Sequence, residues 1–189
     1  MRLAALLPRR RLPPGVEMHP EAHVARDVRF DVAPGARLIL ERGCRIGGGT
    51  RFDVASGEVT VGADALLGRR CVVQARDRIT IGHGVRTGDF VMLTDALPPE
   101  DDADVEQPLR HVGRRSAPVE IGEGAMLGAG ACVQGGVRVG AGAVLEAGSL
   151  AAREVPAGAT HVGVPAGPPS RPRARRGRRR LGGRDSTER

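Results

Sequence analysis

Histidine is the side chain best suited to transfer a proton near neutral pH, and this chain of 189 residues has five histidines. Imidazole accepts a proton from a hydroxyl group readily because its pKa lies near neutrality. His111 lies in a polar segment that interrupts a regular pattern, and His83 follows a glycine at a turn of that pattern. Asp95 begins the same segment, and its carboxylate is suited to orient a hydroxyl but is a poor base for an alcohol. Each of the three also has a structural interpretation as a solvent-facing loop or turn residue.

The cysteines do not suggest metal or redox chemistry. Cys44 and Cys71 occupy small positions of the repeat, where a buried thiol serves as a small hydrophobic group. Cys132 has no partner at a metal-ligand spacing. A zinc site made of three imidazoles at a subunit boundary would have only two of the five histidines, His83 and His111, near it. We therefore expect structural cysteines and no metal.

The elements that position these side chains follow a period of six residues. The stretch IGEGAMLGAGACVQGGVRVGAGAVLEAGSLA, from Ile121 to Ala151, has a large apolar residue at nearly every sixth position and a small one four residues later. A helix repeats its apolar residues every three or four positions and a strand every two, so this period belongs to a compound unit of short strand and turn. Stacked units of this kind form a parallel β-helix.

The same period occurs upstream in groups of three, which predicts triangular coils of eighteen residues. The groups begin at Leu40, Val61 and Ile81, and extra residues occur only after the third strand of each coil. At that corner a long loop, Thr94–Pro118, leaves the stack, and the pattern resumes at Ile121. Val24 begins a weaker first coil.

The C-terminal coils resemble a known family. The motifs IGEGAMLGAG, VRVGAGAVLEAGSLAAREVPAGA and VGVPAG, within Val119–Ala166, are similar to the end of hexapeptide-repeat acyltransferases of the maltose and sugar O-acetyltransferase type. The resemblance implies an all-β, left-handed parallel β-helix over residues 24–168, with an N-terminal arm at 1–23 and an Arg-rich tail at 169–189, which we expect to be disordered. It further implies a homotrimer in which acyl-coenzyme A, commonly acetyl-coenzyme A, and a small hydroxyl-bearing acceptor such as a sugar meet between subunits.

The resemblance also assigns coenzyme contacts. The pantetheine arm of coenzyme A would lie along small residues at Gly128, Ala129, Ala147 and Gly148, and Arg153 would bind the nucleotide phosphates. The same small residues are equally explained by the needs of the coil turns.

One departure from the family concerns the catalytic base. Resembling enzymes have a histidine early in the extruded loop, whereas the stretch TDALPPED here has Leu97 or Pro98 at that place. His111, or alternatively His83, is the candidate replacement, with Asp95 as a contact to the acceptor. Two hypotheses follow: a coenzyme A-dependent O-acyltransferase, or a catalytically inactive trimeric scaffold that keeps the fold.

Charge and hydropathy limit the remaining alternatives. The last twenty residues hold nine of the 29 arginines against two acidic residues, so the net charge of +7 belongs to the tail and the body is neutral. The tail has no aromatic residues, so we do not expect nucleic-acid binding. The N-terminus has only a short apolar run, which predicts neither a signal peptide nor a membrane span and favours a cytoplasmic protein.

Overall fold

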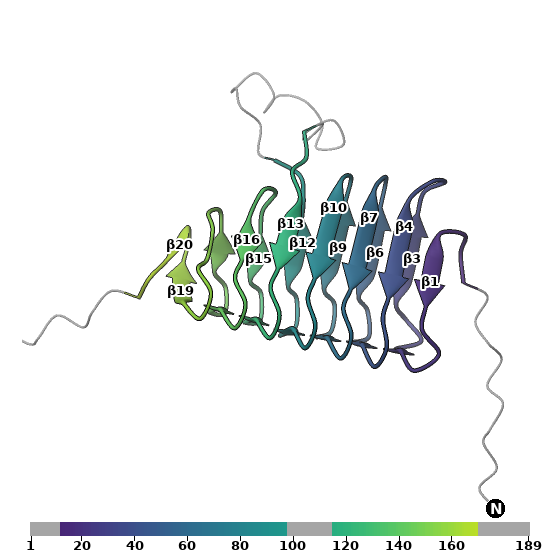
Figure 1. Cartoon of the computed structure of the whole chain (residues 1–189), viewed down its shortest axis with the longest axis horizontal. Coiled ribbons are helices and arrows are strands. Elements are labelled where there is room, and N and C mark those ends of the chain that lie inside the picture. Colours follow the sequence, from purple (N-terminus) through teal and green to yellow (C-terminus); the bar gives the residue numbers. More distant parts are fainter. Residues whose placement is uncertain (1–11, 98–114, 170–189) are drawn as a thin grey trace, which may run out of the picture.

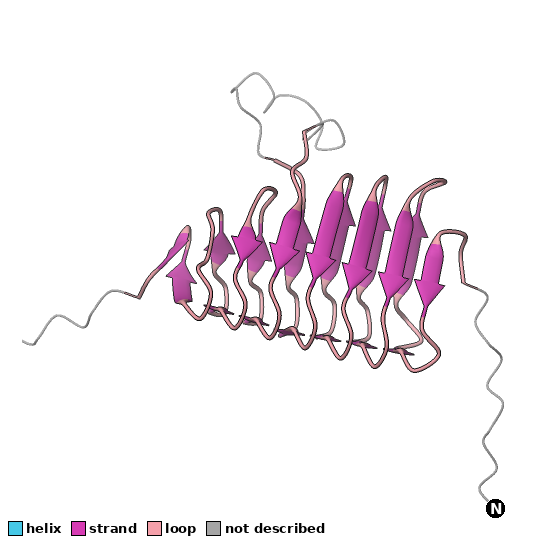
Figure 2. Ribbon diagram, viewed as in Figure 1, coloured by secondary structure: helices cyan, strands magenta, loops and turns pink. Residues whose placement is uncertain are grey.

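The structure, a computed structural model, describes residues 12–97 and 115–169 and forms a three-sided stack of short parallel strands (Figure 1). Each coil contributes one strand to each of three sheets, and six coils follow one another along the stack. The described ranges contain strands and loops and no helix, so no helix there is long enough to cross a membrane (Figure 2). The predicted parallel β-helix is confirmed.

The three sheets are numbered here in chain order. The first sheet contains β1 (Val16–Met18), β4 (Arg37–Leu40), β7 (Glu58–Val61), β10 (Arg78–Ile81), β13 (Val119–Ile121) and β16 (Arg138–Val139). The second contains β2 (His23–Val24), β5 (Arg45–Ile46), β8 (Leu66–Leu67), β11 (Arg86–Thr87), β14 (Met126–Leu127), β17 (Val144–Leu145), β19 (Thr160–Gly163) and β20 (Ala166–Gly167). The third contains β3 (Arg29–Val32), β6 (Arg51–Val54), β9 (Val72–Ala75), β12 (Met92–Thr94), β15 (Cys132–Val133) and β18 (Leu150–Ala151).

The interior is filled by the residues that the period of six selects. The predicted positions stack in register, as Leu40, Val61 and Ile81 do in the first sheet, and all three are buried. Phe52 is fully buried against Phe30, with ring centroids 5.7 Å apart. Burial of each such side chain contributes about 1.5 to 3 kcal/mol, and most of it depends on contact with neighbouring coils.

Three corners join the sheets. The first corner joins the first sheet to the second, as at Gly82–Gly84; the second joins the second sheet to the third, as at Gly128–Gly130. The third corner returns the chain to the next coil, and it holds the extra residues, such as Ala55–Gly57. The prediction that insertions are confined to one corner is therefore confirmed.

The long loop leaves the stack at the third corner through a closed base. The N–H of Leu97 donates to the carbonyl of Arg115 at 3.0 Å, and that of Ala117 donates to the carbonyl of Asp95 at 2.9 Å. Residues 98–114 of the predicted loop lie outside the described residues, as do residues 1–11 and the tail from residue 170.

The first coil begins earlier than expected. β1 pairs in parallel with β4, from Val16 opposite Leu38 to Met18 opposite Leu40, so residues 16–23 belong to the stack and not to an N-terminal arm. The expected start at residue 24 was wrong because a terminal coil is covered on one side only. Its residues, such as Met18, remain partly exposed and need not follow the apolar pattern.

Candidate functional site

The four small residues predicted to line a coenzyme lie together at the second corner. Two turns stack there, Gly128–Gly130 and Glu146–Gly148. The N–H of Gly128 donates to the carbonyl of Leu145 at 2.7 Å, and the N–H of Gly148 donates to the carbonyl of Ala129 at 2.9 Å. These bonds hold Ala129 and Ala147 at equivalent positions of successive coils.

The second corner changes character along the stack. The middle turn residues, in coil order, are Arg26, Gly48, Arg69, Asp89, Ala129 and Ala147. The residue after each is Arg70 and then Phe90 in the central coils, but Gly130 and Gly148 in the last two. Ala129, Gly130, Ala147 and Gly148 therefore form an exposed ledge of small residues, called the shelf below.

The shelf presents backbone donors. Among the described residues, no acceptor is bonded to the N–H of Ala129 or Ala147. The same turn position elsewhere shows that this N–H is accessible from outside: the carboxylate of Asp89 accepts from the N–H of Arg69 at 2.7 Å, and that of Glu41 accepts from the N–H of Ala63 at 2.9 Å. The shelf therefore offers two outward donors, one from each coil.

The glycines of the shelf turns have distinct structural causes. A Cβ at Gly128 would lie 2.3 Å from the amide nitrogen of Ala147, so this glycine is required for one coil to stack on the next. Gly148 has φ +67, a conformation that glycine adopts without strain, and a Cβ there would meet nothing within 4 Å. Gly128 is thus explained by stacking alone, whereas open space surrounds Gly148.

Arg153 lies at another edge of the molecule. It follows β18 and is exposed at the third corner, so the third sheet separates it from the shelf. Within one chain the structure does not bring Arg153 to the small residues with which the sequence grouped it.

Asp95 is buried at the third corner and is bonded to the backbone. Its side chain is 1% exposed, and one oxygen, Oδ2, accepts from the N–H of Arg76 at 2.8 Å and from the N–H of Asp77 at 2.6 Å. Oδ1 is buried without a hydrogen-bond partner in the described structure. These two hydrogen bonds hold Asp95 against the corner of the preceding coil, whereas the sequence predicted a contact between its carboxylate and the acceptor.

The two candidate bases are not at the shelf. His83 is exposed at the first corner, where its carbonyl accepts from the N–H of Gly124 at 2.9 Å. His111 lies outside the described residues. The described candidates are therefore spread over all three corners: His83 lies at the first, the shelf at the second, and Asp95 and Arg153 at the third.

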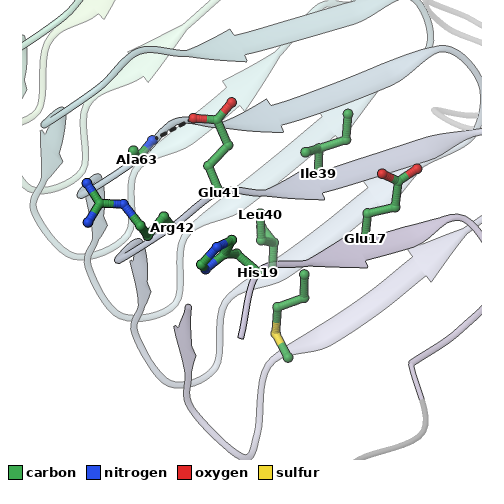
Figure 3. A pocket seen from close by; sticks show the side chains of 8 residues that line it. Glu17, His19, Ile39, Leu40, Glu41, Arg42 and Ala63 are labelled. Carbon is green, nitrogen blue, oxygen red and sulfur yellow. Dashed lines mark hydrogen bonds between the residues drawn. The ribbon is translucent and has the colours of Figure 1, made fainter. Parts of the chain in front are cut away.

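A recess that the sequence did not indicate opens at the first two coils. Its volume is about 480 Å³, and its lining includes Glu17, His19, Glu41 and Arg42 (Figure 3). Glu41 is occupied by the N–H of Ala63. The recess was missed because residues 17–19 were assigned to the arm, and its charged lining follows no recurring motif.

Burial raises the thiol pKa of all three cysteines. Burial raises the pKa of Cys44 to about 11, with smaller contributions from Glu41 and Asp64, and burial also raises the pKa of Cys71. Cys132 is half-buried on the outer face of the third sheet, where burial raises its pKa as well. In the described ranges, no three His, Cys, Asp or Glu residues form a group able to hold a metal ion.

Comparison with known proteins identifies the last coils. Residues 118–150, which contain both turns of the shelf, match the family described as the hexapeptide repeat of succinyl-transferase. Nodulation protein L of Rhizobium meliloti (strain 1021) is 42% identical over 108 residues, which cover 57% of each chain. The last coils of the chain therefore carry the hexapeptide repeat of this family. This hexapeptide-repeat protein is also 33% identical over 143 residues to serine acetyltransferase 1 of Arabidopsis thaliana, across 76% of this chain and 34% of the relative.

Solved structures agree with this hexapeptide-repeat fold. A mutant of AntD, an N-acyltransferase from Bacillus cereus in complex with dTDP-4-amino-4,6-dideoxyglucose and coenzyme A, superposes with a TM-score of 0.68 over 78% of this chain and 79% of AntD. At 16% identity this likeness shows the fold alone. The chain spans 57% of the length of nodulation protein L and about a third of that of the serine acetyltransferase.

Proposed function

We propose that the protein transfers an acyl group, commonly acetyl, from acyl-coenzyme A to a hydroxyl group of a small, sugar-like acceptor. The observation that carries this proposal is the shelf, which combines small side chains with two outward N–H donors in the segment that matches the family. Further support comes from the relative named serine acetyltransferase, whose namesake acceptor is a small molecule with a hydroxyl group.

The shelf is suited to a thioester. When the acceptor oxygen attacks the thioester carbonyl, a C–O bond forms, the carbonyl oxygen becomes an oxyanion, and the coenzyme A thiolate then leaves. The N–H of Ala129 is proposed to donate to this oxyanion, and a fixed donor of this type contributes about 3 to 4 kcal/mol to catalysis. The N–H of Ala147 is proposed to bind an amide carbonyl of the pantetheine arm.

The phosphates of coenzyme A require a cation. Arg153 has an exposed guanidinium group, which can form paired hydrogen bonds with phosphate oxygens. Since Arg153 and the shelf lie at opposite edges of the third sheet, the proposed homotrimer would have to unite them across a subunit boundary, with the acceptor bound in the same cleft.

A base must take the proton of the acceptor hydroxyl. We assign this role to His111, which belongs to the loop predicted from the sequence, with His83 as the alternative. The exposed position of His83 at the first corner permits proton exchange with solvent, but the described structure places it away from the shelf.

The second candidate function is an inactive trimeric scaffold. It is favoured by the sequence, in which Leu97 or Pro98 stands where resembling enzymes have a histidine, and by Asp95, whose Oδ2 accepts hydrogen bonds from the backbone. In that case the shelf would bind coenzyme A without turnover, or its small residues would only allow one coil to stack on the next.

A thiol-release assay tests the proposal. Acetyl-coenzyme A is incubated with the full chain and a panel of sugars and amino alcohols, and free coenzyme A is measured with a thiol reagent. We expect turnover with at least one acceptor, a loss of about 100-fold or more in His111→Ala, and little change in His83→Ala. Binding without turnover across the panel supports the scaffold, and an unchanged rate in His111→Ala removes that residue as the base.

Arg153 has a matched control. Arg153→Ala is expected to raise KM for acetyl-coenzyme A about tenfold, because a charge-assisted hydrogen bond contributes about 1.5 to 3 kcal/mol. Arg138→Ala, which removes an exposed arginine from the first sheet, should leave KM unchanged. An equal effect of both substitutions would show a general charge effect and would refute a phosphate site at Arg153.

A further inference from the structure

An open groove follows the outer face of the second sheet beside the second corner. Its volume is about 700 Å³, and it spans the first three coils and reaches one residue of the fourth. The polar side chains that line it are those of His23, Arg45, Arg69 and Asp89. The first three can donate hydrogen bonds to an anion, and Asp89 is the one acidic residue among the described residues that line the groove. This surface, called the cationic groove below, has no role in the acyl transfer described so far.

The arginines of the cationic groove have no carboxylate partner. On the first sheet, Arg37 lies opposite Glu58 of the next coil and bridges to it at 3.0 Å. On the second sheet, the residue opposite Arg45 in the next coil is Leu66. Within the described ranges, no ion pair involves Arg45 or Arg69. Each guanidinium group can therefore form paired hydrogen bonds with the oxygens of a phosphate or carboxylate group.

The positive residues lie in one outward column of the second sheet. His23 lies opposite Arg45 in the preceding coil, and Arg86 lies opposite Leu66 in the following coil. All four side chains are exposed, and this column has no carboxylate in the first four coils. Cations held close together repel one another, and a bound anion removes that repulsion. The column is therefore better explained as an anion site than as a device that stabilises the sheet.

Asp89 lies at the end of the cationic groove that is nearest to the shelf. Its carboxylate accepts from the N–H of Arg69 at 2.7 Å, and its carbonyl accepts from the N–H of the shelf residue Gly130 at 2.8 Å. The negative charge thus lies beside the shelf, and the positive charges lie toward the first coil. A ligand with one anionic end would bind with that end away from the shelf and with its neutral end beside it.

The spacing of the coils sets the length of such a ligand. Arg69 lies two coils before Ala129 of the shelf, and Arg45 lies three coils before it. Neighbouring strands of a sheet are about 4.8 Å apart, so these separations along the stack are about 10 and 14 Å. Because arginine side chains are long, a phosphorylated or carboxylated sugar of one or two rings can reach from these residues to the shelf.

We propose that the cationic groove binds the oxyanion group of a small sugar-like molecule, a phosphate or a carboxylate, through Arg45, Arg69 and His23, and that this molecule is the acceptor. The naming of the acceptor rests on the proposed function. A hydroxyl group at the neutral end would receive the acyl group at the shelf, and the oxyanion group would take no part in bond formation. The site is separate from Arg153, which is assigned to the phosphates of the coenzyme.

Calorimetric titration of the full chain with glucose 6-phosphate, glucuronate and glucose tests the site directly. We expect at least one of the two anionic sugars to bind about tenfold or more tightly than glucose, because hydrogen bonds to a charged group discriminate by at least this factor. The tighter of the two identifies the oxyanion group as phosphate or carboxylate. Equal affinity for all three sugars would overturn the proposal.

Substitution of Leu66 tests the site without removing an arginine. Leu66 is 41% exposed, so a polar residue is tolerated there. Leu66→Glu supplies Arg45 with the carboxylate partner that arginines of the first sheet already have, and it should lower the affinity for the anionic sugar by about tenfold or more. Leu66→Gln has the same size without the charge and should bind as the unmodified protein does. An equal effect of the two variants would overturn the proposal.

The cations are tested by Arg45→Gln and Arg69→Gln, with Arg78→Gln as the matched control. Arg78 is exposed on the first sheet, so its loss changes the net charge equally without touching the cationic groove. We expect the first two variants to lower the affinity for the anionic sugar by about tenfold and Arg78→Gln to leave it unchanged, with the fold checked by circular dichroism. An equal loss in all three variants would show a general charge effect and would overturn the proposal.

Thiol release from acetyl-coenzyme A separates this site from the proposed function. Equal kcat/KM for glucose and the anionic sugars, unaffected by Leu66→Glu, would overturn the cationic groove and leave acyl transfer in place. Binding of an anionic sugar that Leu66→Glu removes, without turnover of any acceptor, would support the oxyanion site and refute acyl transfer. A loss of affinity in Leu66→Glu for acetyl-coenzyme A alone would assign the arginines to the coenzyme and overturn the proposal.

Discussion

Substitutions of Asp95 can show whether its carboxylate stabilises the fold or contacts the acceptor. Oδ2 accepts two N–H groups, from Arg76 at 2.8 Å and from Asp77 at 2.6 Å. Each hydrogen bond to a charged group contributes about 1.5 to 3 kcal/mol, so Asp95→Ala should lower the free energy of unfolding by about 3 to 5 kcal/mol. Asp95→Asn can keep both bonds, because both use the same oxygen. Asp95→Asn should lower the free energy of unfolding by about 1 to 2 kcal/mol, because a neutral amide oxygen accepts a weaker hydrogen bond than a carboxylate.

The assay is urea unfolding followed by far-ultraviolet circular dichroism, because the chain has no Trp or Tyr to give a fluorescence signal. The three proteins are compared at one protein concentration, since assembly would contribute to stability. The reasoning is refuted if Asp95→Ala unfolds within about 1 kcal/mol of the unmodified protein. It is also refuted if Asp95→Asn leaves stability unchanged but raises KM for the acceptor, since the carboxylate would then contact the substrate.

Three further predictions concern the core and the turns. Because burial raises the pKa of Cys44 from 9.0 to about 11, the unfolded thiol ionises first. Stability present below pH 9 should therefore decline between pH 9 and 11 by about 2 to 3 kcal/mol relative to Cys44→Ala, and parallel curves for the two proteins would contradict this. Gly128→Ala, whose Cβ would meet the Ala147 amide, should cost at least about 2 kcal/mol in urea unfolding, and a neutral result would disprove the close approach. Phe52→Ala should cost about 3 to 5 kcal/mol, and less than about 1 would show that Phe52 is not a core residue.

The period of six predicted the fold because each repeat has the same geometric task. A residue such as Val61 or Ile81 must point inward at the same level of every coil, so the sequence repeats whenever the structure does. The same reasoning located the third corner, since extra residues are tolerated only where the chain leaves the prism. Terminal coils escape this constraint, which explains why residues 16–23 were missed.

The candidate site was only partly predictable. The shelf residues Ala129 and Ala147 were predicted from the resemblance of the last coils to the family, and the structure places them at the same turn position of successive coils. The burial of Asp95 was not predictable, because nothing in Thr94–Leu97 shows that the carboxylate turns back to the amides of the preceding coil. The residues around Arg153 likewise did not show that it lies at another corner than the shelf. Arg153 follows a strand of the third sheet, whereas the shelf turns follow strands of the second sheet.

Calorimetric titration with acetyl-coenzyme A measures whether the shelf binds the pantetheine arm of coenzyme A. Ala147→Trp fills the shelf, whereas Ala141→Trp places the same side chain on the equivalent exposed turn position at the first corner. We expect Ala147→Trp to weaken binding of acetyl-coenzyme A by about 100-fold or more, and Ala141→Trp to bind it as the unmodified protein does. Equal affinity of the two variants for acetyl-coenzyme A would show that the coenzyme does not bind at the shelf.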